Sequence, residues 1–343
     1  MPAEWEPHDS TWLAWPHYRN DWPGKFDPIP WVYAEIIRHL ARHERVDLIV
    51  NNATSEQNAR KVLERANALH QNLRFHRWPT DRVWTRDSGC TFVHAHNGGR
   101  PRRAAVNWCF NAWAKYRNWK NDEKIGTLMA QAAAAEEVLA TYRNRRVVLE
   151  GGSIDVNGSG ALLTTEECLL STEQQRNAGM QRQDYEKVFA QYLGIRKVLW
   201  LGRGILGDDT HGHVDDLARF VTPNTVVTMV EGNKKDENYK ALQENLQRLK
   251  SATDQDGNAL RIVEIPMPSA VIFEGRRLPA SYGNFYIANG LVLVPVFNDP
   301  NDRVALNILA ELFPAREVVG IYSGDLIWGF GAMHCMTQQQ PAL

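Results

Sequence analysis

Five polar clusters along the chain hold residues whose types could carry out chemistry together. Their markers are Asp87, Glu150, His213, Asn284 and Cys335, and Asp215 follows two residues after His213. Carboxylates gathered in one site are costly unless a cation compensates them, so the three acids predict a positively charged ligand. A planar guanidinium satisfies two carboxylates through paired N–H donors, which makes a guanidine the expected ligand.

The weak electrophilicity of a guanidinium predicts which side chain attacks it. Its pKa of roughly 12.5–13.8 keeps it protonated, and its central carbon needs a strong nucleophile such as a thiolate. Cys335 is therefore the predicted nucleophile. Burial near carboxylates should raise the pKa of this thiol in the empty site, and a bound cation beside a protonated His213 should reverse that effect.

His213 and Glu150 complete the hypothesis. An imidazole can hand a proton to departing ammonia and later take one from the attacking water. We expect His213 to perform both transfers and Glu150 to orient the imidazole and raise its pKa. The residues thus favour hydrolysis of a guanidine to a ureido group and ammonia.

The elements that must position these residues follow a repeating pattern. Four hairpins are predicted, each opening on a polar cluster: WTRDSGCTFV (84–93), LEGGSIDVNGSGALLTT (149–165), HGHVDDLARFVTPNTVVTMV (211–230) and SYGNFYIANGLVLVPV (281–296). The markers lie about 50 to 70 residues apart. This regularity predicts a hairpin-helix-strand module repeated about five times around an axis, with the strand starts facing one centre. The alternative is an ordinary α/β protein, in which rough spacings of this kind also occur.

Helices and short apolar strands alternate between the hairpins. Helices are predicted over 29–43, with Pro30 at the start, over 54–69, over 171–194, with Ser171 as the N-cap, and over 236–250. Strands are predicted over 45–50, 196–202, 260–266 and 316–322. The alternation is typical of an α/β fold.

Composition and charge argue against several classes of protein. The chain has 343 residues, 43% hydrophobic and 23% charged, with a net charge of −1, as in ordinary soluble domains. It has no sustained basic block and no apolar run of the ~18 residues that a membrane helix needs, so neither nucleic acid nor a membrane is an expected partner. With no signal-peptide pattern, a cytoplasmic protein is predicted. The four cysteines form no CxxC pair, so neither a disulfide framework nor structural zinc is expected.

Five motifs closely resemble those of the agmatine deiminase and bacterial peptidylarginine deiminase family. They are WTRDSG (84–89), LEGGSIDVNG (149–158), THGHVDD (210–216), SYGNFYIANG (281–290) and GAMHCMTQQQP (331–341). EWEPHDSTWLAWP (4–16) and NWCFNAWAKY (107–116) extend the resemblance over nearly the whole chain. It implies a five-bladed α/β propeller (pentein) with ββαβ-type modules, here one deiminase domain over residues 1–343. It also implies hydrolysis of agmatine to N-carbamoylputrescine and ammonia, a step of putrescine and polyamine biosynthesis.

The resemblance further implies a role for each site residue. Cys335 resembles the nucleophile that forms a covalent amidino-thiol intermediate, His213 the general acid/base and Glu150 its carboxylate partner. Asp87 and Asp215 resemble the clamps on the guanidinium.

Two further residues are assigned to substrate binding by the same resemblance. Trp84 is similar to a tryptophan along the aliphatic stem of the substrate, and Asp209 stands where such enzymes can carry an acid that faces the distal amine. Neither a cofactor nor a metal is implied, the partner is a small guanidine such as agmatine, and a homodimer is implied because related agmatine deiminases are often dimeric.

Departures from the family pattern affect specificity and leave the catalytic set intact. FNAWAKY (110–116) is shorter than the usual FNAWGGKY, GFGAMHC (329–335) replaces GGGNIHC, and His211 stands where an acid or Asn is common. Arginine residues in peptides, or another guanidine, therefore remain alternative substrates. A propeller that binds a guanidinium without catalysis remains an alternative to an enzyme.

The string HGHVDD (211–216) also resembles the HxHxD start of a binuclear zinc hydrolase, which keeps a metal-dependent hydrolase as a further alternative. Against it stand the lack of a second His/Asp cluster and an idle Cys335. His211 is expected to be a solvent-facing or hydrogen-bonded loop residue, and Cys90, Cys109 and Cys168 are expected to be small core residues.

Overall fold

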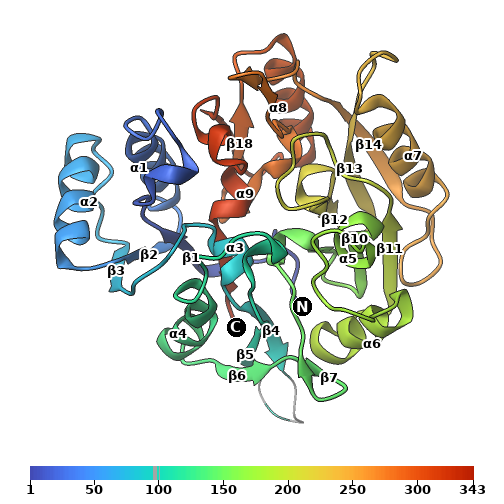
Figure 1. Ribbon diagram of the computed structural model, residues 1–343, viewed down its shortest axis with the longest axis horizontal. Helices are drawn as coiled ribbons and strands as arrows, with labels where there is room; N and C mark the ends of the chain where they lie inside the picture. Colours follow the sequence, from blue (N-terminus) through green and yellow to red (C-terminus); the bar gives the residue numbers. More distant parts are fainter. Residues whose placement is uncertain (96–98, 100) are drawn as a thin grey trace.

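The chain folds as a mixed α/β protein arranged around one centre. The computed structural model describes residues 1–95, 99 and 101–343. The sheets and their covering helices surround short turns in the middle of the molecule, with α3 and α9 close together there (Figure 1). Every helix in this described part is too short or too polar to cross a lipid bilayer.

Five sheets of three or four strands occur within the described residues. The first, in the order β20-β1-β2-β3, consists of β20 (Gln338–Pro341), β1 (His8–Ala14), β2 (Arg45–Val50) and β3 (Leu73–Arg77). The second consists of β4 (Thr91–Ala95), β5 (Arg102–Asn107) and β6 (Glu136–Leu139), and the third of β9 (Asp155–Val156), β10 (Ala161–Thr165) and β11 (Lys197–Leu201). The fourth consists of β12 (Ala218–Thr222), β13 (Thr225–Val230) and β14 (Arg261–Pro266), and the fifth of β17 (Tyr286–Ala288), β18 (Leu291–Val296) and β19 (Glu317–Tyr322). Two small hairpins add β7 (Thr141–Tyr142) with β8 (Arg145–Arg146), and β15 (Ile272–Phe273) with β16 (Arg276–Arg277).

All five sheets repeat one pairing pattern. A central strand pairs antiparallel with one neighbour and parallel with the other; the central strands are β1, β5, β10, β13 and β18. The predicted hairpins are confirmed as β4–β5, β9–β10, β12–β13 and β17–β18. The four predicted strands are confirmed as β2, β11, β14 and β19.

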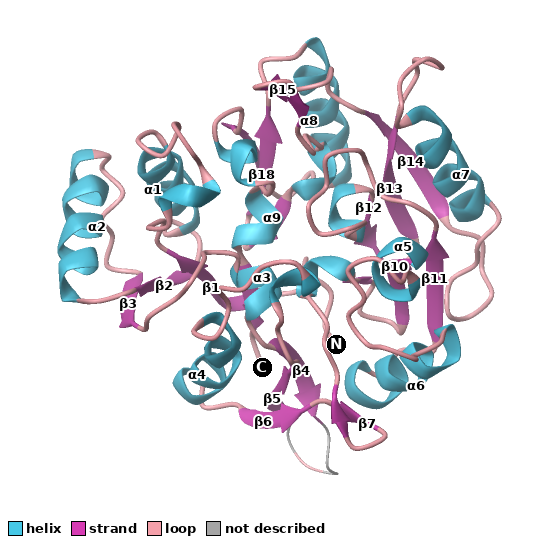
Figure 2. Cartoon of the chain, viewed as in Figure 1, coloured by secondary structure: helices cyan, strands magenta, loops and turns pink. Residues whose placement is uncertain are grey.

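Helices connect the parallel strand pairs, because a parallel connection needs a crossover (Figure 2). They are α1 (Ile29–Leu40), α2 (Ala53–Arg65), α4 (Ile125–Ala132), α5 (Glu166–Leu170), α6 (Arg182–Leu193), α7 (Tyr239–Lys250) and α8 (Pro300–Leu312). The helices predicted over 29–43, 54–69 and 236–250 are confirmed as α1, α2 and α7. Helix α8 was not predicted, although Asp299 as N-cap and Pro300 at the first position are its sequence signal.

The helix predicted over 171–194 is wrong in its first half. Helix α6 begins only at Arg182, where the Asp184 carboxylate accepts a hydrogen bond of 3.0 Å from the Gln181 backbone N–H. Ser171 ends α5, and Gln174 (φ 44°) and Gly179 (φ 82°) adopt left-handed conformations that an α-helix does not contain. Residues 171–181 therefore form a loop.

Five short helical turns form the centre of the molecule. They are α3 (Thr85–Ser88), the 3-10 turns η4 (Gly151–Ser153), η5 (Val214–Asp216) and η6 (Tyr282–Asn284), and α9 (Met333–Met336). They contact one another in a ring, from α3 through η4, η5, η6 and α9 back to α3. Each marker residue lies in its turn or directly before it, so the fold brings the five polar clusters together.

Candidate active site

Cys335 lies in α9 and is buried beside polar partners from three other turns. The Asn284 side-chain amide donates to its Sγ at 3.1 Å, and Sγ lies 3.6 Å from Asp215 Oδ2. Burial, together with the carboxylates of Asp215, Asp216 and Asp87, raises the pKa of this thiol well above its usual value. In the empty site the cysteine is therefore a thiol, as the sequence predicted.

His213 lies between two carboxylates. Its Nδ1 is 3.9 Å from Asp87 Oδ2, its Nε2 is 3.7 Å from Glu150 Oε2, and neither ring nitrogen makes a hydrogen bond. Burial lowers the pKa of His213, but Asp87, Glu150 and the nearby Cys168 outweigh it and hold the pKa well above its usual value. The ring is thus an imidazolium that can give up a proton.

Asp87 and Asp215 are held in place by different partners. Trp113 Nε1 and the Gly152 backbone N–H donate to the Asp87 carboxylate at 2.9 and 3.0 Å, and burial raises the pKa of Asp87 to about 6. Asp215 Oδ2 is 2.8 Å from His334 Nδ1, whereas its buried Oδ1 has no hydrogen-bond partner. A buried carboxylate oxygen without a partner is a vacant acceptor.

Gly152 allows the side chains of His213, Asp215 and Asp87 to lie close together. A Cβ atom at this position would lie 2.5 Å from His213 Nδ1 and 3.0 Å from both Asp215 Oδ2 and Asp87 Oδ1. Only a residue without a side chain leaves the three groups this close.

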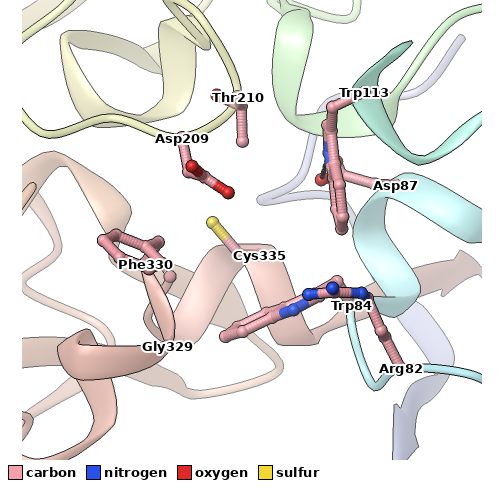
Figure 3. Close-up of a pocket in the computed structure, with 10 residues that line it drawn as sticks. Arg82, Trp84, Asp87, Trp113, Asp209, Thr210, Gly329, Phe330 and Cys335 are labelled. Carbon is pink, nitrogen blue, oxygen red and sulfur yellow. Dashed lines mark hydrogen bonds between the residues drawn. The ribbon is translucent and has the colours of Figure 1, made fainter. Parts of the chain in front are cut away.

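A pocket leads to the thiol. It is lined by Arg82, Trp84, Asp87, Trp113, Asp209, Thr210, Gly329, Phe330, Gly331 and Cys335 (Figure 3). Trp84, Trp113 and Phe330 form aromatic walls around the sulfur (Figure 3). Of the seven predicted site residues, Cys335, Asp87, Trp84 and Asp209 line the pocket, and His213, Glu150 and Asp215 lie buried behind it.

Asp209 already has a cationic partner inside the protein. Its carboxylate accepts hydrogen bonds from Lys115 Nζ and from the Tyr116 hydroxyl. Both donors follow three consecutive residues with left-handed φ angles of 50, 58 and 54°, Ala112 to Ala114. The altered FNAWAKY segment thus places Trp113 in the pocket and Lys115 on Asp209.

Several buried residues that complete the site were not predicted. Arg176 donates from Nε to both oxygens of Glu150, at 3.0 and 3.3 Å. Although burial would raise the pKa of Glu150, Arg176 and His213 lower it to about 2. Arg176 lies in the loop that was predicted to be helical, so its pattern gave no signal of this role.

A second missed group extends from Asp215 to the start of the chain. His334 Nε2 is 2.8 Å from Glu4 Oε2, and Glu4 also pairs with Arg86 and Arg219, at 3.1 and 2.9 Å. The position of His334 next to Cys335 in the sequence was the available signal.

Cys168 is buried, as predicted, but it is not simply a core residue. One ligand atom from each of Glu150, Cys168 and His213 lies within 4.8 Å of the other two, the one such group among the described residues. Zinc uses this donor set. However, the Arg176 guanidinium on both Glu150 oxygens places a full positive charge where a metal cation would bind, which disfavours a metal.

The side chain of His211 lies away from the site that contains His213. Its Nε2 lies 3.2 Å from Ser171 Oγ, and it lines a different groove, with Glu167 and Asp208. It is a hydrogen-bonded loop residue, and neither His211 nor Asp215 belongs to the group of Glu150, Cys168 and His213, so the HxHxD string does not form a metal site in the described part of the chain.

The whole chain matches one protein family and several of its relatives. The sequence profile of the Porphyromonas-type peptidyl-arginine deiminases matches residues 1–341. The agmatine deiminase of Stutzerimonas stutzeri is 36% identical, and that of Pseudomonas aeruginosa 35%, with 100% of this chain and 95% of each relative covered. The solved structure of the Enterococcus faecalis agmatine deiminase superposes with a TM-score of 0.90 at 31% identity, over 99% of this chain and 95% of that one. The chain belongs to the Porphyromonas-type peptidyl-arginine deiminase family.

Proposed function

We propose that the protein is a hydrolase of linear amidines that converts agmatine and water into N-carbamoylputrescine and ammonia. Relatives that match over nearly their full length include agmatine deiminases. The observation that carries the proposal is a set of buried, unpartnered polar atoms beside a thiol, namely Asp215 Oδ1 and both ring nitrogens of His213. The vacant Asp215 oxygen next to a thiol suits a cation that brings several N–H donors and an electrophilic carbon, and the unpartnered N–H groups of the His213 imidazolium suit a leaving nitrogen that takes up a proton.

The guanidinium would bind between Asp87 and Asp215. Each carboxylate would accept N–H groups, and the positive charge would stabilise the Cys335 thiolate at the moment that the substrate arrives. The thiol proton passes to solvent water as the cation enters and is taken up again after the product leaves, so the substrate itself activates the nucleophile.

In the first half of the reaction, Sγ of Cys335 forms a bond to the central guanidine carbon. His213, an imidazolium in the empty site, donates its proton to one amino nitrogen, and the C–N bond breaks to release ammonia. A cationic amidino-thiol on Cys335 and a neutral imidazole remain.

In the second half, His213 takes a proton from water while the oxygen adds to the amidino carbon. Collapse of this adduct breaks the C–S bond, restores the thiolate and leaves the ureido product after loss of one proton. That proton converts the released ammonia to ammonium at neutral pH, so atoms and charges balance.

The pocket accounts for the rest of the substrate. Trp84, Trp113 and Phe330 would cover the apolar butyl stem of agmatine, and Asp209 at the outer end would pair with its terminal ammonium. The ammonium must first displace Lys115 from Asp209 or share the carboxylate with it.

The fold supports one further part of the proposal. We infer that the five sheets are the blades of a five-bladed α/β propeller that forms a single domain over residues 1–343. The common pairing pattern and the ring of five turns favour this arrangement.

The test is ammonia release from agmatine, free arginine and an arginine-containing peptide, with Cys335→Ala as the blank. Release from agmatine above the other two supports the proposal. Release of ammonia from the peptide alone would agree with the proposed mechanism but would show that the substrate is a peptide and not agmatine. Silence with all three, together with agmatine binding, would indicate a protein that only binds guanidines.

A further inference from the structure

Arg176 connects three parts of the site with one guanidinium. Its side chain is fully buried. Besides Nε on Glu150, its Nη2 donates to the Thr210 carbonyl at 2.5 Å and its Nη1 to the Gln174 carbonyl at 2.8 Å. A planar fork with donors in fixed directions suits such a junction, and a lysine could not reproduce it.

The contact with Glu150 controls the charge next to His213. Glu150 is fully buried, and its carboxylate lies 3.7 Å from the imidazole without a shorter hydrogen bond between them. Arg176 and His213 are the cations that offset the burial of this carboxylate. Without Arg176, burial would favour the neutral acid, and the imidazolium of His213 would lose one of its counter-charges.

The contact with Thr210 fixes the loop that carries His213. The His213 backbone N–H lies 3.3 Å from Thr210 Oγ1 and 3.1 Å from Asp208 Oδ2. Thr210 also lines the pocket. Holding its carbonyl therefore sets the position of the general acid/base from the backbone side.

Gln174, two residues before Arg176, extends the same connection to the pocket wall. Its Nε2 donates at 3.1 Å to the Trp113 carbonyl and at 3.1 Å to the Asp209 carbonyl. The loop 171–181 thus connects the carboxylate behind His213 with both pocket segments.

We propose that Arg176 is a positioning residue of the enzyme, which presents Glu150 to His213 and holds the Thr210 segment so that the imidazole meets the substrate in one orientation. It does not touch the substrate and acts only through its partners. This inference rests on the proposed function.

The experiment compares Arg176→Ala and Arg176→Lys with Arg248→Ala, which removes an arginine that also pairs with two glutamates but lies outside the site. We expect kcat on agmatine to fall about 10- to 100-fold in Arg176→Ala, with KM within about threefold of wild type. The high-pH limb of the kcat profile should move to lower pH, because His213 loses its proton more easily beside a neutral Glu150. Arg176→Lys should recover only part of kcat, and Arg248→Ala should match the wild type.

A second readout does not depend on the substrate. With isotope-labelled histidine, the His213 resonance, assigned by its loss in His213→Asn, should titrate at lower pH in Arg176→Ala than in the wild type. Arg176→Lys, which keeps the charge but not the fork of donors, should lie between the two. A wild-type enzyme that releases no ammonia from agmatine would contradict the proposed function, while this titration would still test Arg176.

Folding is checked by circular dichroism. If Arg176→Ala does not fold, Arg176→Lys decides the question. Unchanged kcat, pH profile and His213 titration in a folded Arg176 variant would overturn the proposal.

Discussion

Asp215 and His334 share a buried contact of 2.8 Å, and the same imidazole lies 2.8 Å from Glu4 on its other side. Burial alone would raise the pKa of Asp215, but His334, His213 and Arg219 lower it. The Asp215 carboxylate beside Cys335 thus owes its charge partly to His334, the residue that precedes this cysteine in the sequence.

This relationship predicts the acid limb of the pH profile. Asp87 and Asp215 must both be ionised to bind a guanidinium, and Asp87, with a pKa of about 6, loses its charge first as the pH drops. In His334→Gln the pKa of Asp215 should rise as well, so the acid limb of kcat/KM should become steeper and move to higher pH. The control is His76→Gln, which removes a buried imidazole 2.7 Å from Asp47, outside the site. Superimposable profiles for His334→Gln and wild type would contradict the assignment.

Gly152 should not tolerate even a methyl group. Its φ is not left-handed, so the cost of Gly152→Ala comes from the contacts at 2.5 and 3.0 Å with His213, Asp215 and Asp87. We expect kcat/KM to fall at least about 100-fold in a folded protein. Gly232→Ala, where a Cβ meets nothing within 4 Å, should behave as wild type. Steady-state ammonia release by both variants decides this, and an active Gly152→Ala would mean that the three groups need not be so close.

Cys335 should react slowly with a neutral alkylating agent. Its pKa is raised by burial and three carboxylates, so the thiolate fraction, and with it the alkylation rate, should still be increasing above about pH 9. Iodoacetamide labelling followed by peptide mass mapping measures this rate. A plateau below about pH 8 would indicate a preformed thiolate and argue against activation by the substrate.

In Cys335→Ser, turnover should fall at least about 1000-fold while agmatine still binds.

Lys115 should compete with the substrate for Asp209. In Lys115→Met the carboxylate keeps Tyr116 but loses its cation, so KM for agmatine should fall a few-fold with little change in kcat. Lys120→Met removes another exposed lysine of the same segment and is the control. If KM increases instead, Lys115 orients Asp209 rather than blocking it.

How much of this site was predictable depends on the range over which each signal acts. The motifs in the sequence were enough to predict that five polar residues share one site. These residues are Asp87, Glu150, His213, Asp215 and Cys335. The contact between Glu4 and His334 spans 330 positions, so no local pattern could reveal it.

Arg176 was missed for a different reason. Residues 173–176 have good helix propensity, so the pattern favoured a helix that includes Arg176. Gly179 was a local signal against that helix, and the structure has both Gln174 and Gly179 in left-handed conformations. Cys168 has an apolar neighbourhood in sequence and is indeed buried, but burial does not reveal that the thiol borders His213.

The pairing of β20 with β1 determines when during synthesis the protein can become active. Strand β20 directly follows Cys335 and lies antiparallel to β1 near the start of the chain. A growing polypeptide therefore lacks Cys335, the proposed nucleophile, and the strand that follows it until residues 333–341 have left the ribosome. Earlier parts of the chain can already have folded around an inert centre, so catalysis begins only with the last strand of the first sheet.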